Sequence, residues 1–280
     1  MKKIALVCSL LVIASSSLVH AQDAALLEAE RSRGILTGGQ GVKWNVSVSG
    51  STSARFTATS QGGTIYAEVT SPEDALNRRY LAESSGEMFF WKPGLSRPIS
   101  VSKRQRLNGD AAIGDIASTS FVDGYSVAGQ ESGTVNGESA TVYSLKANSL
   151  SDTYALIKYW VTTNENLGKK AEFYSASGTM IRSATMDYGN QAMGRPFLSR
   201  MVISESGSNV NLSFSGVQVS SFPSSTFTQE YLTRKPEGGA GKPGDKPADK
   251  PTTKPASKPT SGSASGEVKK PFGGLFKKKE

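Results

Sequence analysis

Residues 42–49, V-K-W-N-V-S-V-S, alternate between apolar and polar side chains. Strict alternation is typical of a strand with one buried face, because successive side chains of a strand point to opposite sides. The stretch therefore predicts a strand that buries Trp44, Val46 and Val48. Similar runs recur at residues 53–59, 63–70, 79–84, 86–93, 139–147, 154–162, 170–174, 179–188, 196–205 and 208–219.

Turn signals separate these runs at short intervals, which favours antiparallel hairpins over crossover helices. The signals are Gly62-Gly63, Gly86, Asn136-Gly137, Gly178 and Gly207. A long antiparallel sheet of about eleven strands is expected to curl, because twist accumulates and open edges invite aggregation. The sequence thus predicts a mainly β fold, an open or half-closed antiparallel barrel. Before it, residues 23–34, D-A-A-L-L-E-A-E-R-S-R-G, predict an N-terminal helix that stops at Gly34.

The strand pattern breaks between residues 92 and 125, where prolines, basic residues and glycines mix with short apolar groups. Such a segment is expected to form loops and short lid helices over the opening of the curled sheet. A covered inner face can then be a hydrophobic cavity rather than a solid core. Ordinary core packing is the alternative for each large side chain available to line it: Trp44, Phe56, Tyr66, Phe89, Phe90, Trp91, Tyr159 and Trp160.

The two ends of the chain differ from the middle. Residues 1–21 carry two lysines, an apolar run and Val19-His20-Ala21, and so predict a signal peptide cleaved before Gln22. Residues 236–280 repeat lysine-proline and then become rich in serine and glycine, which predicts a disordered tail. The tail's end, P-F-G-G-L-F-K-K-K-E, fits either a weak membrane-surface anchor or a solubilising terminus. Residues 22–235 are the predicted folded domain.

Composition excludes several kinds of chemistry. Cys8 and His20 are the only cysteine and histidine, and both precede Gln22. The mature chain therefore lacks thiol nucleophiles, disulfides, Cys/His zinc sites and imidazole acid–base groups. The formal net charge is +8, but the tail holds 10 lysines and 5 acidic residues while the domain is nearly neutral. Since nucleic-acid binding needs a basic face on the folded part, we expect no nucleic-acid partner.

A set of short motifs resembles the LolA-like outer-membrane lipoprotein-sorting family. They begin with Trp91-Lys92-Pro93 and end with Phe227-Thr228-Gln229-Glu230-Tyr231-Leu232. Between them, in order, lie Arg97, Arg104 and Arg106, then Gly109-Asp110, Gly114-Asp115 and Asp123, Tyr159-Trp160-Val161, Ala171-Glu172-Phe173-Tyr174 with Ser177-Gly178, and Gly194-Arg195-Pro196 with Met201. The resemblance implies an open antiparallel barrel that carries lipoprotein acyl chains through the periplasm in a hydrophobic cavity. The lysine-proline tail and residues 148–152, N-S-L-S-D, depart from the family pattern.

The charged residues of the middle segment admit two interpretations. Arg97, Arg104 and Arg106 fit docking of an anionic headgroup or an acidic membrane partner, or else a solvated loop. Asp110, Asp115 and Asp123 do not have the spacing of a calcium loop, so we expect no metal and no cofactor.

Three functions follow from these patterns. The first is a non-enzymatic periplasmic carrier of lipoprotein acyl chains or another lipid, working with an inner- or outer-membrane protein. The second is a lipid-sensing or adaptor module of the same fold that partners a membrane transporter. The third is a lipid or glycan hydrolase, which requires two carboxylates facing each other across a cleft, for example one from the pair Glu73-Asp74.

Overall fold

The computed structural model describes residues 16–35, 39–50, 53–102, 119–150 and 152–234, which belong to one compact unit. The predicted tail lies outside these residues, as do the first fifteen residues of the predicted signal peptide. The helix α1 (Ser16–Ser32) begins earlier than the helix predicted from residue 23 and ends, as predicted, just before Gly34. Gly34 has a φ of +84°, which favours glycine after a helix end.

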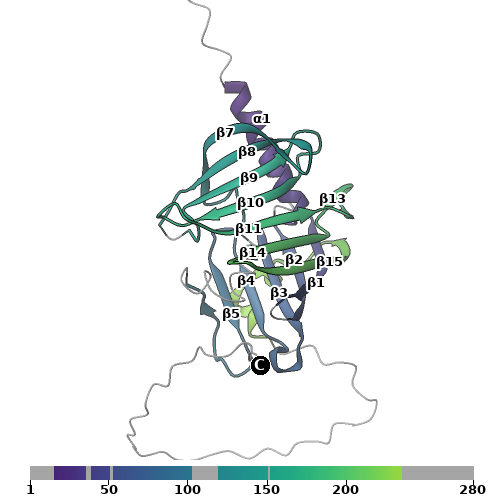
Figure 1. Ribbon diagram of the computed structural model, residues 1–280. Coiled ribbons are helices and arrows are strands. Elements are labelled where there is room, and N and C mark those ends of the chain that lie inside the picture. The colour runs from purple at the N-terminus through teal and green to yellow at the C-terminus, as the bar shows by residue number, and fades with distance from the viewer. Residues whose placement is uncertain (1–15, 36–38, 51–52, 103–118, 151, 235–280) are drawn as a thin grey trace, which may run out of the picture. The chain divides into compact units, whose positions relative to one another are not determined.

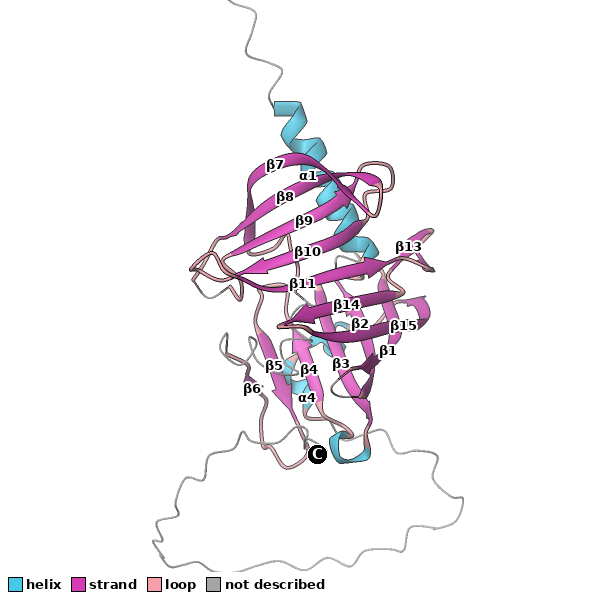
Figure 2. Cartoon of the chain, in the orientation of Figure 1, coloured by secondary structure: helices cyan, strands magenta, loops and turns pink. Residues whose placement is uncertain are grey.

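One antiparallel sheet of 13 strands dominates the fold (Figures 1 and 2). Its strands lie in the order β6-β5-β4-β3-β2-β1-β15-β14-β11-β10-β9-β8-β7 and do not close into a barrel. Their bounds are β1 (Gly41–Ser49), β2 (Ala54–Gln61), β3 (Thr64–Ser71), β4 (Arg79–Ala82), β5 (Met88–Trp91), β6 (Ile99–Ser100), β7 (Tyr125–Val135), β8 (Glu138–Ala147), β9 (Leu156–Thr162), β10 (Gly168–Tyr174), β11 (Met180–Asp187), β14 (Arg200–Glu205) and β15 (Ser208–Ser220). The prediction of a mainly β, open antiparallel fold is confirmed.

The smaller elements pack against this sheet. A separate hairpin of β12 (Asn190–Ala192) and β13 (Arg195–Phe197) contacts α1, which also contacts β9 and β10. The short helices η1 (Glu73–Ala75), η2 (Ser224–Phe227) and α4 (Gln229–Leu232) complete the described elements. The predicted lid helices fall mainly on residues 103–118, which lie outside the described part of the chain.

The strand count exceeds the predicted eleven for local reasons. The edge strand β7 was not among the predicted runs. Its sequence, Y-S-V-A-G-Q-E-S-G-T-V, has no apolar alternation, as expected for a strand whose side chains are mostly exposed. The predicted run 196–205 divides between β13 and β14, which belong to different sheets.

The predicted turns are confirmed: Asn136 and Gly137 both have positive φ values, +51° and +81°, as a tight two-residue hairpin turn requires.

The main core lies on one face of the curled sheet. It includes residues from both wings of the sheet, with Leu26 and Ala29 of α1 and Phe197 of β13 packed among them. We call the sheet face that carries Trp44 and Tyr159 the inner face, and the opposite one the outer face. No helix of the described residues has the length and apolar character needed to cross a membrane.

Candidate ligand-binding site

Strand register decides which predicted residues share the inner face, since directly paired residues lie on the same side of a sheet. From Val46 in β1, pairing leads to Phe56 in β2 and to Val69 in β3. From Ala67 in β3, it leads to Tyr80 in β4 and Phe90 in β5. Trp44, Phe56 and Phe90 therefore belong to the inner face.

Tyr159 also lies on the inner face, in the other wing of the sheet. It pairs with Tyr143 of β8 and Ala171 of β10 and is fully buried. Its hydroxyl end occupies the space above Gly168, where a Cβ atom would lie 1.7 Å from the Tyr159 hydroxyl oxygen. A glycine is therefore required at position 168 for this packing.

The other four predicted residues lie on the outer face. Tyr66 and Trp91 form a second apolar cluster with Leu81, and half-buried Phe89 packs against it. This cluster is covered by Phe227, Tyr231 and Leu232 from the C-terminal segment. Trp160 is on the outer face of β9, where the Lys170 ammonium lies 4.4 Å from its ring centroid.

The C-terminal segment is held on the outer face by a buried arginine. Arg79 is completely buried and donates hydrogen bonds to the Glu68 carboxylate, at 3.1 Å, and to the carbonyl oxygen of Leu232, at 2.9 Å. Arg234 donates to the Tyr66 hydroxyl at 2.9 Å and stacks on the Tyr231 ring. These contacts fix the end of the described chain away from the inner face.

The inner face has two different halves. Beneath α1 it is a solid core, in which Phe121 makes edge-to-face contacts with Tyr159 and Phe173 at centroid separations of 5.1 and 5.5 Å. On β2–β6 the apolar side chains are less covered. Phe56, Tyr80 and Ile99 are only half-buried there.

An aromatic row marks this less covered half. The Tyr80 ring lies 6.4 Å from the Phe56 ring and 5.1 Å from the Phe90 ring, measured between centroids. Ile99 pairs with Phe90 and extends the row to the edge strand β6. This apolar strip is the candidate ligand-binding site, and its chemistry suits a hydrocarbon chain.

A buried ion pair lies at the C-terminal end of α1. The Arg33 guanidinium donates to the Glu30 carboxylate at 2.7 Å, and both side chains are fully buried. The backbone N–H of Phe121 donates to the other Glu30 oxygen at 2.8 Å, and Arg33 stacks on the Phe121 ring at 3.7 Å. Burial raises the pKa of Glu30 although Arg33 opposes the shift.

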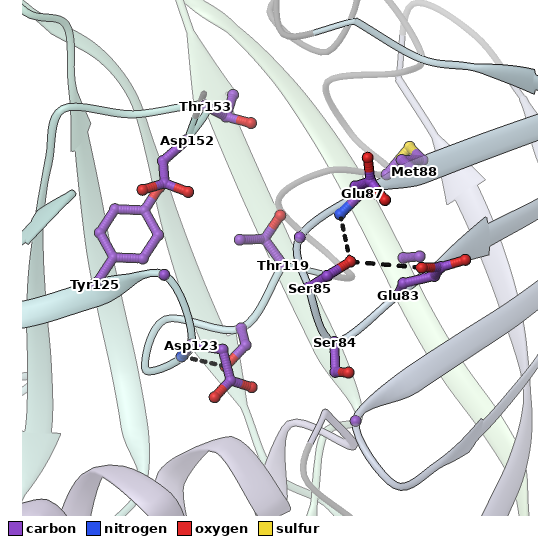
Figure 3. Close-up of a pocket in the computed structure, with 15 residues that line it drawn as sticks. Glu83, Ser84, Ser85, Glu87, Met88, Thr119, Asp123, Tyr125, Asp152 and Thr153 are labelled. Carbon is purple, nitrogen blue, oxygen red and sulfur yellow. Dashed lines mark hydrogen bonds between the residues drawn. The ribbon is translucent and has the colours of Figure 1, made fainter. Parts of the chain in front are cut away.

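A small cavity of about 30 Å³ opens at the rim of the sheet (Figure 3). The β4–β5 turn lies on one side, and residues 119–125 with Asp152 and Thr153 lie on the other. Glu83, Glu87, Asp123 and Asp152 surround it, and Ala82 and Met88 connect it to the inner face. Its volume suits about one water molecule, so the cavity is a rim feature and not itself an acyl-chain site.

No cluster of three or more potential metal ligands occurs among the described residues.

The predicted basic docking residues are only partly described. Arg97 is exposed between β5 and β6, while Arg104 and Arg106 lie outside the described residues. Sequence reasoning missed Tyr80 and Phe121. The signal for Tyr80 was a large aromatic side chain within the predicted strand at residues 79–84, although its face follows only from the register. Phe121 had no strand pattern around it.

A protein-family model described as "Uncharacterized protein" matches residues 64–234, which is more than half of the chain. The chain belongs to that family. The match starts at β3 and ends at Arg234, so it includes the aromatic residues Tyr80 and Phe90 and the covering C-terminal segment. A search of curated proteins found no match.

Solved structures show that this family member has the LolA-like fold. A LolA superfamily protein from Nitrosomonas europaea aligns with a TM-score of 0.60 at 24% identity, covering 74% of this chain and 98% of that one. A putative outer membrane lipoprotein-sorting protein domain from Vibrio parahaemolyticus aligns with a TM-score of 0.62 at 16% identity, covering 76% of this chain and 99% of that one. A DUF1329 family protein from Desulfovibrio piger aligns with a TM-score of 0.59 at 17% identity, covering 75% of this chain and 98% of that one. The resemblance inferred from the sequence is confirmed for the fold.

Proposed function

We propose that this protein is a non-enzymatic carrier that binds the acyl chain of a lipoprotein or another lipid along Phe56, Tyr80, Phe90 and Ile99. The observation that carries the proposal is the aromatic row on the inner face of an open sheet. Phe56 and Tyr80 are half-buried in this row, and Phe90 is buried between Tyr80 and half-buried Ile99. Half-buried apolar side chains keep part of their surface in water, and a hydrocarbon ligand that covers this surface gains about 0.8 kcal/mol for each of its own CH₂ groups that becomes buried.

The similar folds support the same class of function. Two of the aligned proteins are named for the LolA superfamily and for outer-membrane lipoprotein sorting. Burial and release of an acyl chain require no covalent step, so the proposal needs neither catalytic residue nor cofactor. Trp44 and Tyr159 lie on the inner face as buried members of the main core, and in this proposal they do not touch the ligand.

We further propose that the carrier works in the periplasm, after removal of residues 1–21, and exchanges its cargo with a membrane protein. Residues 22–235 form the binding domain in this proposal. The lysine-rich tail at 236–280 supplies a weak contact with an anionic membrane surface. Arg97, Arg104 and Arg106 are candidates for contact with a headgroup or an acidic partner.

The test uses the mature chain, purified from its own envelope and analysed by native mass spectrometry. A co-purifying lipid mass is the expected result. Delipidated protein is then titrated with a fluorescent fatty acid. Tyr80→Ser, on the inner face, should weaken binding by roughly tenfold, since it removes the aromatic ring at the centre of the row. Tyr174→Ser removes a half-buried tyrosine from the outer face of β10 and should leave the affinity unchanged. Failure of the wild-type protein to take up the probe would overturn the proposal.

A further inference from the structure

The rim of the candidate site is attached to the end of α1 mainly through Phe121. Residues 119–125 run into β7, and Thr119, Ser120, Asp123, Gly124 and Tyr125 among them line one side of the rim cavity. Within this stretch Phe121 is completely buried, whereas Asp123 and Gly124 are exposed. The exposed part is thus held on one side by Phe121 and on the other by the Asn148 backbone N–H, which donates to the Gly124 carbonyl oxygen at 2.9 Å.

Glu30 and Arg33 hold Phe121 from the same helix end. Glu30 accepts a hydrogen bond from the Phe121 backbone N–H at 2.8 Å, and the Arg33 guanidinium carbon lies 3.7 Å from the centroid of the Phe121 ring. A second Arg33 nitrogen donates to the carbonyl oxygen of Thr119 at 3.4 Å. The pair thus contacts the ring and the backbone of the segment at two residues.

A purely stabilising role does not explain why these groups are charged. Two fully buried charges are costly to desolvate, and an apolar pair of similar size often stabilises a core equally well. The hydrogen bond to the Phe121 N–H and the contact with the Thr119 carbonyl need polar partners at these positions, because apolar side chains supply neither.

We propose that Glu30 and Arg33 are positioning residues that fix residues 119–125 at the rim of the candidate site, so that release of the bound ligand depends on this pair. The inference rests on the proposed function, because it assigns a regulatory element to the same site.

The test compares two double variants of the full mature chain. In Glu30→Leu with Arg33→Met, both charges and the acceptor for the Phe121 N–H are absent. In Glu30→Gln with Arg33→Met, both charges are absent but an amide oxygen remains as acceptor. Neither variant leaves one charge buried alone, which would itself threaten folding. The two differ only in the group that faces the Phe121 N–H.

Two measurements are made on each variant: hydrogen exchange of the Phe121 amide, and the dissociation rate of a fluorescent fatty acid. In the leucine variant we expect exchange at Phe121 to accelerate on the order of tenfold, as loss of one buried hydrogen bond implies, and probe release to accelerate several-fold. The glutamine variant keeps an acceptor for the Phe121 N–H but lacks the Arg33 contacts, so it should lie between the leucine variant and the wild type in both. The matched control is Glu28→Gln with Arg195→Gln, which breaks an ion pair between α1 and β13 and should change neither.

Three results would overturn the inference. Equal Phe121 exchange in the two variants would mean that Glu30 does not hold the segment. Faster exchange spread evenly over β8–β11 would mean general loss of stability. Faster Phe121 exchange with an unchanged release rate would mean that residues 119–125 do not control release of the ligand. A wild-type protein that takes up no probe would instead count against the proposed function, and the exchange data would still decide whether Glu30 fixes Phe121.

Discussion

Tyr159 and Trp160 are consecutive residues of β9 that lie on opposite faces of the sheet. Tyr159 is fully buried on the inner face next to Tyr143, and Trp160 is half-buried on the outer face beneath the Lys170 ammonium. A single step along a strand therefore separates the core of the protein from its surface. Any role for an aromatic pair such as this one has to be assigned residue by residue.

Trp160→Ala should leave the affinity for a fluorescent fatty acid within about twofold of the wild type. The indole contacts Lys170 on the outer face and has no place in the aromatic row on β2–β6. Titration of the delipidated protein measures the affinity, and circular dichroism checks the strand content. A tenfold loss with intact strands would place the ligand on the outer face.

Gly168→Ala should destabilise the protein by about 2–3 kcal/mol, because overpacking forces a buried neighbour to move. The new Cβ would lie 1.7 Å from the hydroxyl oxygen and 2.1 Å from Cζ of Tyr159, and that ring is fully buried. Urea unfolding measures the change in the free energy of unfolding. Gly129→Ala in β7 is the control, because its Cβ would meet no atom within 4 Å. Equal stability of the two variants would contradict the packing described for Tyr159.

Arg79→Met should lower the free energy of unfolding by about 2–4 kcal/mol, since it leaves the buried Leu232 carbonyl without the Arg79 donor and removes the donor to one oxygen of the Glu68 carboxylate. Hydrogen exchange should rise first in the residues of α4. The neighbouring Arg78→Met is the control, as Arg78 is only half-buried and its guanidinium donates to the backbone carbonyl oxygen of the exposed Asp74. Unchanged exchange in α4 would show that the C-terminal segment stays attached without Arg79.

Tyr174 should ionise about two pH units above an ordinary tyrosine. Burial and the hydrogen bond that its hydroxyl donates to Glu172, at 2.6 Å, raise the pKa of Tyr174 to about 12. Because this pKa is raised in the folded state, the tyrosine favours folding below pH 10, and that contribution is lost as the pH rises through 12.

The ionisation is measured from ultraviolet absorbance, as the difference between the wild type and Tyr174→Phe. Glu172→Gln should lower the Tyr174 pKa toward 10, because the amide carries no negative charge. Glu165→Gln, at an exposed position in the β9–β10 turn, should not move it. A midpoint that is the same in the Glu172 variant and the wild type would exclude Glu172 as a cause.

Alternation in the sequence was sufficient for most of the sheet. The run at residues 42–49 coincides with β1, and its predicted buried residues Trp44, Val46 and Val48 are buried. The same reasoning failed for β7, whose exposed polar side chains carry no alternation. It also failed for Phe121, because a residue outside a periodic element is buried by contacts with distant segments, here α1, β9 and β10.

The face on which each aromatic residue lies could not be predicted where several stand together. In Phe89-Phe90-Trp91 and Tyr159-Trp160, every position is apolar, so no alternation distinguishes the inner from the outer side. Register resolves them: Phe90 and Tyr159 are on the inner face, and Phe89, Trp91 and Trp160 on the outer one. The outer apolar cluster exists because a C-terminal segment more than 130 residues away covers it, with Leu232 over Leu81 and Trp91.

The order of side chains along the chain was enough to determine that this protein forms an open antiparallel sheet, because hydrophobic periodicity and turn chemistry act between near neighbours. Only the tertiary structure decided where the less covered apolar strip lies and that Glu30 and Arg33 hold Phe121. Those relationships depend on long-range strand pairing and on the docking of α1. Hydrophobic periodicity in the sequence indicates neither of them.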